Sequence, residues 1–242
     1  MIPKKIHYCW FGGNPLSSQA KKCIESWKRY CPDYEIIEWN EKNFDIDCCS
    51  YVREAYDAKK WAFVSDYARF SILYDQGGLY FDVDVELVRS LDDIVAQGAF
   101  MGCEENGIVA PGLGLAVEPG HELYKMLLDG YRNRSFYADD KTMDLTTVVA
   151  YTTGYLKKYG LKDVEDVQRI EGILIYPKEF FCPKDPVTRE IHITDRTVAI
   201  HHYDGSWLEK DRRFVQKVTD LFGYRVTKVL IKIKHCLRGG NR

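Results

Sequence analysis

The chain has 242 residues, of which 45% are hydrophobic and 14% aromatic, and its formal net charge is −2. These values predict a globular protein with a full hydrophobic core, built as one large domain or as one domain with a small appendage. The sequence lacks a run of 18 apolar residues that could span a membrane, and its eight cysteines form no CxxC pair, which excludes a typical zinc cluster.

The first ninety residues alternate between strand and helix patterns. Residues 6–11 have the pattern of a strand that Gly12 and Gly13 end, and Asn14-Pro15 then predicts the start of a helix that runs to about residue 30. Residues 34–39 have the pattern of a second strand. Strand, helix and strand at this spacing indicate a βαβ unit and so an α/β fold with a mainly parallel sheet flanked by helices.

Residues 60–76 form a segment of helical length so rich in aromatic and aliphatic side chains that most of the helix must be buried. Gly77 is its expected C-cap. Asp66 and Arg69 are three residues apart and therefore neighbours on one side of this helix. Charges on a buried helix need partners, so the two residues form either a structural ion pair or part of a functional site.

The stretch from Gly77 to Glu86 reads as a short apolar strand that ends in two carboxylates, Asp82 and Asp84. Alternate side chains of a strand share a face, so both carboxylates should lie on one face, about 7 Å apart, while Phe81 and Val83 point into the core. Hard oxygen ligands of this kind suit Mg²⁺ or Mn²⁺ together with phosphates. The alternative is a strand edge with two solvated acids.

The central third is less informative, and we read no internal repeat or linker in it. One domain is therefore expected over residues 1–220. The segments expected after residue 90 are apolar runs at 98–103 and 113–117, helices at 119–131 and 140–159, and strands at 172–176 and 197–203.

Residues 221–242 form a separate C-terminal segment with six Lys and Arg residues and no Asp or Glu. Apolar residues recur there at steps of three and four, which predicts an amphipathic helix with a basic polar side. Such a helix can lie on an anionic membrane surface or pack on the domain. The N-terminus has no apolar run of signal-peptide type, so we expect a cytoplasmic protein associated peripherally with the inner face of the cell membrane.

Four motifs recur together in a known family. They are the opening IPKKIHYCWFG, the segment CPDYEIIEWN, the core FVSDYARFSILYDQGGLYFDVDVEL and the late HHYDGSW. In this order they resemble glycosyltransferase family 32, the DXD sugar-binding glycosyltransferases, over about residues 2–90 and 197–208. The resemblance implies a GT-A fold that binds a nucleotide-diphosphate sugar with the help of Mn²⁺ or Mg²⁺.

The resemblance also implies roles for single residues. Asp84 would bind the metal directly, and Asp82 would contact it through water or hold the donor ribose. Catalytic roles would fall to Asp66, Arg69 and Asp84, with Asp66 and Arg69 holding the donor's sugar hydroxyls and diphosphate. The donor-binding residues would be Trp10, Tyr80, Asp82, Ser206 and Trp207.

The late motif is similar to the His-x-x-Gly segment of other retaining GT-A enzymes, whose histidine completes the metal coordination. On that spacing His202, three residues before Gly205, is expected to be the metal ligand beside Asp82 and Asp84. His201 is then expected to face the core, because neighbouring residues on a strand point to opposite sides.

These observations together predict a retaining, metal-dependent glycosyltransferase. It would move a hexose from a UDP- or GDP-linked sugar to a saccharide acceptor, most simply a lipid-linked one, in capsule, exopolysaccharide or surface-glycan synthesis. Nucleic acid is not expected as a partner. Two alternatives are an aspartate-type phosphatase, which also uses Asp-x-Asp and Mg²⁺, and a non-catalytic protein that binds sugar or a membrane surface on a transferase fold.

Overall fold

The computed structural model describes residues 1–204. The predicted C-terminal helix, Ser206 and Trp207 lie outside the described residues. The described strands are β1 (Lys5–Cys9), β2 (Glu35–Trp39), β3 (Gly78–Tyr80), β4 (Val85–Leu87), β5 (Phe100–Glu105), β6 (Ile108–Val109), β7 (Leu115–Val117), β8 (Gln168–Ile170), β9 (Ile173–Tyr176) and β10 (Ala199–His201). The described helices are α1 (Ser18–Tyr30), α2 (Ser50–Asp57), α3 (Trp61–Gln76), α4 (Asp92–Val95), α5 (Glu122–Arg132), α6 (Val148–Lys157) and α7 (Lys178–Phe181).

The chain divides into two units. The first contains Met1–Pro183 and Ile193–His202 and holds all of these elements. The second contains Lys184–His192 and the chain from Tyr203 onward. In its described part a bridge joins Lys184 to Ile191, and the Asp185 carboxylate accepts hydrogen bonds from the amides of Val187 and Thr188 at 2.8 and 2.7 Å.

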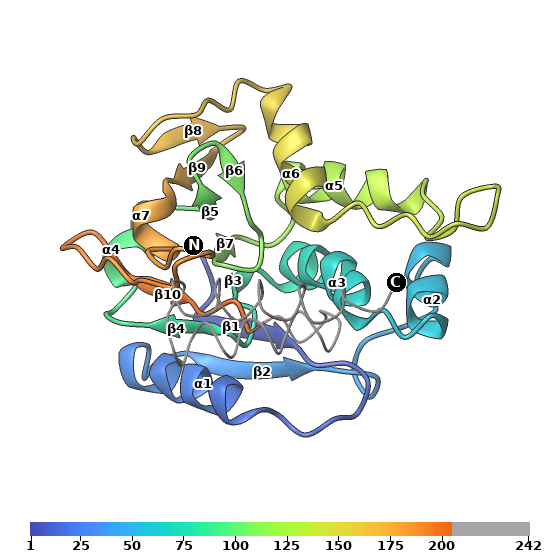
Figure 1. The fold of residues 1–242 in the computed structure, drawn as a ribbon, viewed down its shortest axis with the longest axis horizontal. Coiled ribbons are helices and arrows are strands. Elements are labelled where there is room, and N and C mark those ends of the chain that lie inside the picture. Colours follow the sequence, from blue (N-terminus) through green and yellow to red (C-terminus); the bar gives the residue numbers. More distant parts are fainter. Residues whose placement is uncertain (205–242) are drawn as a thin grey trace, which may run out of the picture. The chain divides into compact units, whose positions relative to one another are not determined.

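The first unit is built on an eight-stranded sheet in the order β2-β1-β3-β7-β5-β9-β8, with β6 paired to β5 (Figure 1). The pairings place β2, β1, β3, β5 and β9 in one direction and β7, β6 and β8 in the other. A separate two-stranded ladder joins β4 to β10 in antiparallel register. The α/β class with a mainly parallel sheet, predicted from the alternation of strands and helices, is confirmed.

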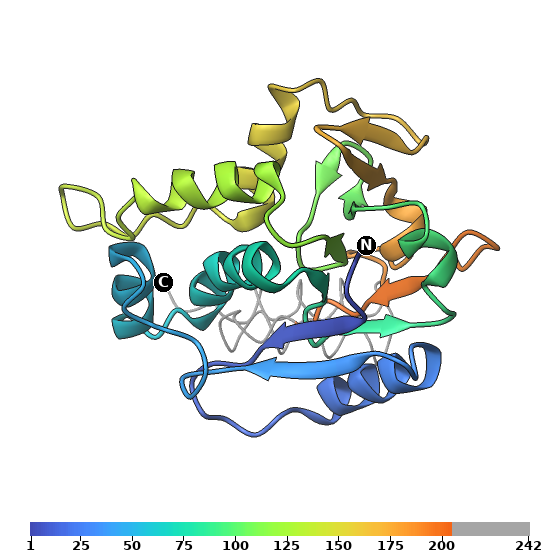
Figure 2. The same cartoon turned by 180° about the vertical axis from the view of Figure 1, so that it is seen from behind.

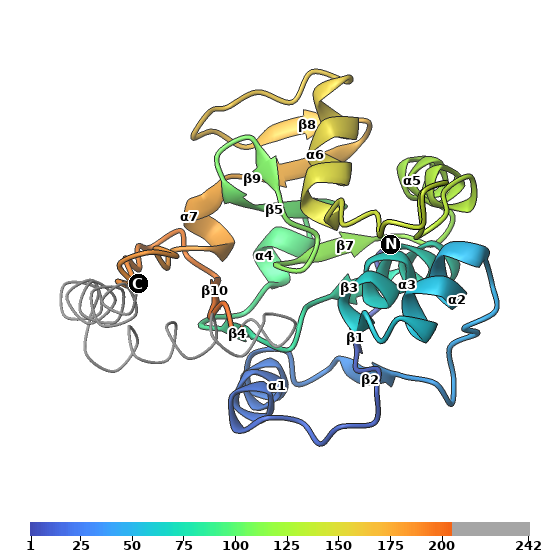
Figure 3. The ribbon, with the colours of Figure 1, turned by 45° about the vertical axis from the view of Figure 1, so that its right-hand side comes forward.

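Helices cover the sheet from both sides. α1 packs against β4, while α3 packs against β1 and β3 and carries α2 and α5 on its outer side. Figures 1 and 2 show α1 beyond β2 on one side and α3 on the other. At the far end of the sheet α7 packs against β5 and β9, and α6 packs against β6 (Figure 3).

The predicted βαβ unit is present, with β1 and β2 parallel and in register from Lys5 with Glu35 to Cys9 with Trp39. The predicted helix start at Asn14 is wrong. α1 begins at Ser18, and Ser17 is its N-cap because the Ser17 hydroxyl accepts a hydrogen bond from the Ala20 amide at 3.0 Å. Trp27 of α1 is fully buried, and its indole N–H donates to the carbonyl of Val85 at 2.8 Å.

The buried helix α3 follows the prediction closely, spanning Trp61–Gln76 with Gly77 as its C-cap. Gly77 has a φ of +63°, and an added Cβ would lie 2.6 Å from the Pro119 ring and 2.9 Å from the Val117 carbonyl oxygen. Only glycine fits both this backbone conformation and this space. The tight stop therefore delivers the chain directly from α3 into β3.

His7 on β1 is a fully buried polar residue between the sheet and the end of α3. Its Nε2 lies 3.0 Å from the Gly77 carbonyl oxygen, and its Nδ1 lies 3.0 Å from the Trp39 indole nitrogen. A carbonyl needs a donor and an indole N–H needs an acceptor, so the neutral imidazole with its proton on Nε2 satisfies both. Burial lowers the pKa of His7 to about 4.

Candidate active site

The candidate site lies where parallel strands of the sheet end. At this edge Trp10 follows β1, Asn40 follows β2 and Phe81 follows β3. The Trp10 amide donates to the Trp39 carbonyl at 2.8 Å, and the Phe81 amide donates to the His7 carbonyl at 3.2 Å, so the three chain ends run side by side. Ligands of open α/β sheets bind at such carboxyl ends.

Asp82 and Asp84 lie on a turn between β3 and β4, and the prediction that they share one face of a strand is wrong. β3 ends at Tyr80 and β4 begins at Val85. The Val85 amide donates to the Asp82 carbonyl at 3.1 Å and closes the turn. Phe81 is fully buried as expected, whereas Val83 is only partly buried. The turn sends the two carboxylates to different partners.

The Asp82 carboxylate is the exposed end of a buried polar network. Arg69 Nη2 lies 3.1 Å from Asp66 Oδ1 and 3.3 Å from Asp82 Oδ1, so one guanidinium joins the two acids. The Tyr80 hydroxyl donates to Asp82 Oδ1 at 3.0 Å, and the Arg69 guanidinium lies over the Tyr80 ring at 5.0 Å. The side chains of Arg69 and Asp66 are 4% and 9% exposed, against 37% for Asp82.

Burial and charge set the protonation of this network. Burial raises the pKa of Asp66 to about 6, against the lowering effect of Arg69. For Arg69 burial would lower the pKa, but Asp82, Tyr80 and Asp66 hold it above its ordinary value. Burial also raises the pKa of Tyr80, which therefore stays neutral and donates its proton to Asp82. At neutral pH the network thus has a fixed cation between two acids.

Tyr80 is fully buried, so this structure places it beneath Asp82 as a support and not in direct reach of a donor.

Gly112 fixes the other side of the Asp82 carboxylate. The Asp82 amide donates to the Gly112 carbonyl at 2.8 Å, and a Cβ at Gly112 would lie 2.0 Å from Asp82 Oδ2. Gly112 is a site residue that the sequence reading missed, and its signal was the glycine-rich run between two apolar segments.

The Asp84 carboxylate has a histidine beside it, but not the predicted one. His201 Nε2 lies 3.3 Å from Asp84 Oδ2, whereas His202 Nε2 lies 2.7 Å from Glu86 Oε2. The register of the β4–β10 ladder determines which histidine lies beside Asp84. The ladder pairs His201 with Val85, and at its end the His202 amide donates to the Asp84 carbonyl at 2.9 Å. Burial alone would lower the pKa of His201, but Asp84 and Cys182 raise it to about 10.

Two further residues near His201 were not singled out from the sequence. Cys182 at the end of α7 is a hydrogen-bond partner of His201, and Glu104 near the end of β5 interacts with its charge. Burial raises the pKa of Glu104, against the lowering effect of His201. An apolar strand that ends in acids, as at residues 100–105, was the available signal for Glu104. No pattern in the sequence pointed to Cys182.

The remaining predicted donor residues lie at the edge of the site or outside the described residues. Trp10 is partly buried, and its indole N–H donates to the Asn14 carbonyl at 2.5 Å, which fixes one edge of the ring. Ser206 and Trp207 are not described. The Gly12 amide, next to Trp10 and Phe11, donates to the Glu41 carboxylate at 2.6 Å.

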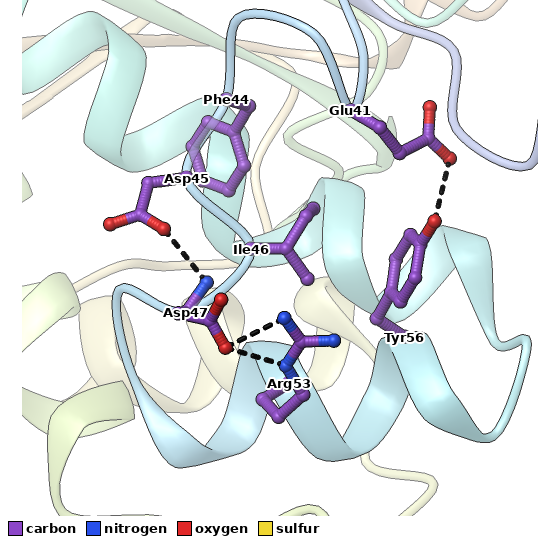
Figure 4. Close-up of a pocket in the computed structure, with 7 residues that line it drawn as sticks. All are labelled: Glu41, Phe44, Asp45, Ile46, Asp47, Arg53 and Tyr56. Carbon is purple, nitrogen blue, oxygen red and sulfur yellow. Dashed lines mark hydrogen bonds and ion pairs between the residues drawn. The ribbon is translucent and has the colours of Figure 1, made fainter.

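Glu41 also lines a pocket between the loop after β2 and helix α2 (Figure 4). There Asp47 binds Arg53 through contacts of 2.6 and 2.7 Å, and the Tyr56 hydroxyl donates to Glu41 at 3.4 Å. Because Asp47 already neutralises the single cation, Glu41 and Asp45 leave the lining negative. A diphosphate would be repelled there, so this pocket is a poor candidate for the diphosphate site. The lining residues are Glu41, Phe44, Asp45, Ile46, Asp47, Arg53 and Tyr56.

The donor atoms at the turn are of the kinds that a divalent cation accepts. Mn²⁺ accepts carboxylate ligands, such as Asp82 and Asp84, and imidazole ligands, such as His201. The Asp82 side chain is partly exposed. Within residues 1–204, however, no three His, Cys, Asp or Glu side chains are already gathered as a ligand set. The chemistry fits a cation that takes its remaining ligands from phosphate and water.

Comparison with known proteins decides the family. Residues 17–101 match the glycosyltransferase sugar-binding region that contains a DXD motif, and this range holds both the Asp66–Arg69 network and the turn. This match identifies the chain as a glycosyltransferase with a DXD-motif sugar-binding region. The same finding favours a glycosyltransferase over the phosphatase and the non-catalytic binding protein.

Curated relatives of this glycosyltransferase occur in Schizosaccharomyces pombe. Inositol phosphoceramide mannosyltransferase 1 is 24% identical over 249 residues, which cover 96% of this chain and 73% of the relative. Inositol phosphoceramide mannosyltransferase 3 is 30% identical over 164 residues, which cover 64% of this chain but only 43% of the relative.

Among solved structures, the glycosyltransferase resembles the PaToxG glycosyltransferase, with a TM-score of 0.48, 18% identity and coverage of 65% of this chain and 70% of that one. It also resembles a glycosyltransferase involved in glycosylation of the major capsid of PBCV-1, with a TM-score of 0.45, 11% identity and coverage of 88% and 98%. As for the membrane, none of the helices within residues 1–204 combines the length and apolar character that a bilayer span requires.

Proposed function

We propose that this glycosyltransferase is metal-dependent and moves a hexose from a nucleotide-diphosphate sugar to an acceptor hydroxyl, with retention of the anomeric configuration. One observation carries the proposal. The turn of Asp82 and Asp84 lies at the carboxyl end of the parallel strands, and directly behind it lies the buried Arg69 guanidinium, which pairs with Asp66 and with Asp82 of the turn.

The cation would be held by Asp82 and Asp84, with His201 next to Asp84. When bound, Mn²⁺ or Mg²⁺ would stabilise the negative charge that develops on the departing diphosphate. Placing His201 in this role replaces the His202 of the sequence prediction, because Asp84 and His201 are 3.3 Å apart while His202 pairs with Glu86.

The protein's own side chains would orient the donor. Arg69 and Tyr80 hold Asp82 in a fixed position from below, and such preorganisation spares the site a rearrangement during the reaction. Asp66 would accept hydrogen bonds from the sugar hydroxyls, and Trp10 would stack on the nucleobase. In a retaining transfer the acceptor hydroxyl arrives on the leaving-group face, so the departing phosphate oxygen can accept its proton.

For the substrates, the relatives' names support a mannosyl or similar hexosyl donor and an acceptor with a lipid part. A lipid-linked saccharide in surface-glycan, capsular or exopolysaccharide synthesis fits that chemistry. The basic segment 221–242 would hold the enzyme at the inner face of the cell membrane. Its residues lie outside the described part of the chain, so this proposal rests on the sequence.

The test is a thermal-stability panel of UDP- and GDP-linked hexoses, each with and without Mn²⁺. One donor should stabilise the protein only when the metal is present, by about 2.7 kcal/mol at a hundred times its Kd. Asp84→Asn should abolish this stabilisation and the release of nucleoside diphosphate, while Asp93→Asn, an exposed acid on α4, should leave both unchanged. Absence of any stabilisation by a sugar nucleotide with Mn²⁺ would refute the proposal.

A further inference from the structure

The pocket between the loop after β2 and helix α2 has no part in the reaction proposed above. Its volume is about 390 Å³. Figure 4 shows the rings of Phe44 and Tyr56 on either side of Ile46, which is buried. Small-molecule sites combine apolar and aromatic walls of this kind with a few placed polar groups. The pocket therefore has the size and the walls of a ligand site.

Two contacts join the aromatic walls of this pocket to the loop that follows β1. The Phe44 ring meets the Phe11 ring edge-on, with 5.8 Å between their centres. The Tyr56 ring meets the Trp61 ring in the same way at 4.9 Å. Trp61 in turn packs against Gly12, where an added Cβ would lie 2.6 Å from its indole nitrogen. Both walls of the pocket therefore rest on the loop after β1, directly or through one ring.

The loop after β1 also separates this pocket from the turn of Asp82 and Asp84. β1 pairs with β2 on one side and with β3 on the other. The pocket follows β2, while the turn follows β3. Neighbouring strands are about 4.8 Å apart, so the ends of β2 and β3 lie about 10 Å apart across the sheet. That separation is comparable with the length of a nucleoside diphosphate from its base to its terminal phosphate.

Glu41 gives the pocket an acceptor edge. The Gly12 amide donates to Glu41 Oε1 at 2.6 Å, and the Tyr56 hydroxyl donates to the same oxygen at 3.4 Å. Within residues 1–204 the hydrogen bonds of this carboxylate thus end on Oε1, and Oε2 keeps its lone pairs. A carboxylate accepts hydrogen bonds and donates none, so a ligand bound here must bring N–H or O–H donors.

The charge of the pocket distinguishes between nucleobases. Asp47 neutralises Arg53, so Glu41 and Asp45 leave the lining negative. Guanine carries two donors side by side, the N1–H and the 2-amino group, which suit the paired oxygens of a carboxylate. Uracil carries one N–H between two carbonyl oxygens, and these oxygens would be repelled by the carboxylate. The lining therefore favours guanine over uracil.

We infer that this pocket receives the base of the donor nucleotide and that Glu41 makes it selective for guanine, so that the donor is a GDP-linked hexose. The inference rests on the proposed function, in which the diphosphate lies at the turn of Asp82 and Asp84. Trp10 is two residues before Gly12 on the loop between pocket and turn, so a base stacked on Trp10 can reach Glu41 with its donor edge. The competing occupant is a saccharide acceptor, whose hydroxyls also suit aromatic rings and carboxylates.

The test is the affinity of the full chain for GDP, inosine diphosphate and UDP with Mn²⁺, measured by isothermal titration. Inosine diphosphate lacks only the 2-amino group of GDP. The wild type should bind GDP about tenfold or more tightly than inosine diphosphate, the equivalent of one hydrogen bond to a charged group, and more tightly than UDP. Glu41→Gln should lose this preference, because an amide places a donor against the donors of the base. Equal affinities in the wild type, or an unchanged preference in Glu41→Gln, would overturn the inference.

The variants separate recognition of the base from folding. Glu41→Gln keeps an oxygen that can accept from the Gly12 amide, so the loop should keep its position. Glu25→Gln removes an exposed glutamate that pairs with Lys28 on α1, and it should keep the wild-type preference as the matched control. Phe44→Leu should weaken binding of all three nucleotides alike, because it removes a ring that packs on the base. Unchanged affinities in Phe44→Leu would contradict a base in this pocket.

A measurement without metal separates this inference from the proposed function. Saturation-transfer NMR should detect guanosine bound to the wild-type chain, but not uridine or methyl mannoside, and the guanosine signal should be lost in Glu41→Gln. If this holds but no sugar nucleotide stabilises the protein with Mn²⁺, the proposed function fails and the guanine pocket stands. If a sugar nucleotide does stabilise it while guanosine and uridine bind equally, the inference fails alone. Binding of methyl mannoside in place of guanosine would assign the pocket to the acceptor and overturn the inference.

Discussion

Gly112 shows how a single residue without a side chain can set the position of a carboxylate. A methyl group at Gly112 would lie 2.0 Å from Asp82 Oδ2, and Arg69 Nη1 is the next group, at 3.3 Å from the added atom. The end of the Asp82 side chain can move away from such a methyl group, so the fold should survive. The contacts of Asp82 with Arg69 and Tyr80 should, however, be lost.

We therefore expect Gly112→Ala to weaken donor binding by about tenfold or more, the equivalent of one lost hydrogen bond to a charged group. Isothermal titration with the donor and Mn²⁺ measures this. Gly154→Ala is the control, because an added Cβ there meets nothing within 4 Å in the middle of α6. The control should bind normally and be more stable by up to about 1 kcal/mol. Equal donor affinity in both variants would contradict the role of Gly112.

His7 gives a second prediction, for stability against pH. Its folded pKa of about 4 lies below the ordinary value of 6.5, so between these values the unfolded chain binds more protons than the folded protein. Stability from His7 is therefore complete above pH 6.5, is lost as the pH falls toward 4, and does not decline further below that.

The effect amounts to about 2 kcal/mol between pH 8 and pH 5. His7→Gln can keep an N–H near the Gly77 carbonyl but cannot titrate. The difference in free energy of unfolding between wild type and His7→Gln, measured by urea denaturation, should shrink by that amount over this range. Asp66, whose raised pKa acts in the opposite direction, cancels because it is common to both proteins. A difference that does not change with pH would contradict the prediction.

At the scale of elements, the sequence predicted those helices and strands that are determined by residues close to them along the chain. α3 was predictable because its helical length, its apolar composition and the glycine after it all agree, and β1 and β2 because apolar runs flank a helix of suitable length. The start of α1 was not predictable from the sequence, because Asn14 and Ser17 are both good N-caps and only the side-chain contact with Ala20 distinguishes them. α2, with an amphipathic pattern over Ser50–Asp57, was missed although its signal was present.

The site was predictable in its residues but not in their pairing. Asp66, Arg69 and Asp82 were singled out from the sequence, and the structure brings them together. The choice between His201 and His202 depends on the register of β10 against β4, strands that are more than a hundred residues apart. A one-residue change of register exchanges the faces of both histidines, and no local pattern determines it.

This register yields a prediction for the two histidines. His201→Ala should weaken Mn²⁺ binding in the presence of the nucleoside diphosphate by tenfold or more, because it removes the side chain next to Asp84. His202→Ala, which loses a contact with Glu86 instead, is its natural control and should have a much smaller effect. Electron paramagnetic resonance of free Mn²⁺ measures both constants. A larger loss in His202→Ala would restore the assignment made from the sequence.

At the scale of the whole molecule, the charge distribution separates the described domain from the C-terminal segment. The described residues carry the sheet, the network behind Asp82 and the turn. Residues 221–242 carry six Lys and Arg residues and no acid, and the remaining residues carry 28 basic and 36 acidic side chains, a net charge of −8. Like charges repel, so the acidic remainder is expected to stay away from an anionic bilayer while the basic segment is attracted to it.

Because each cation near an anionic surface contributes about 1 kcal/mol, replacing Lys228, Lys232 and Lys234 with glutamine should weaken binding to phosphatidylserine-containing vesicles by about a hundredfold. The triple variant keeps the apolar positions, so it tests charge separately from hydrophobic insertion.

Removal of residues 221–242 should abolish vesicle binding yet keep Mn²⁺-dependent stabilisation by the donor, since the proposed ligands Asp82, Asp84 and His201 all precede residue 205. Vesicle sedimentation measures the first effect and thermal unfolding the second. If the truncated protein sediments with anionic vesicles as the full chain does, the surface that binds them lies in residues 1–220 and the membrane role of the segment is wrong.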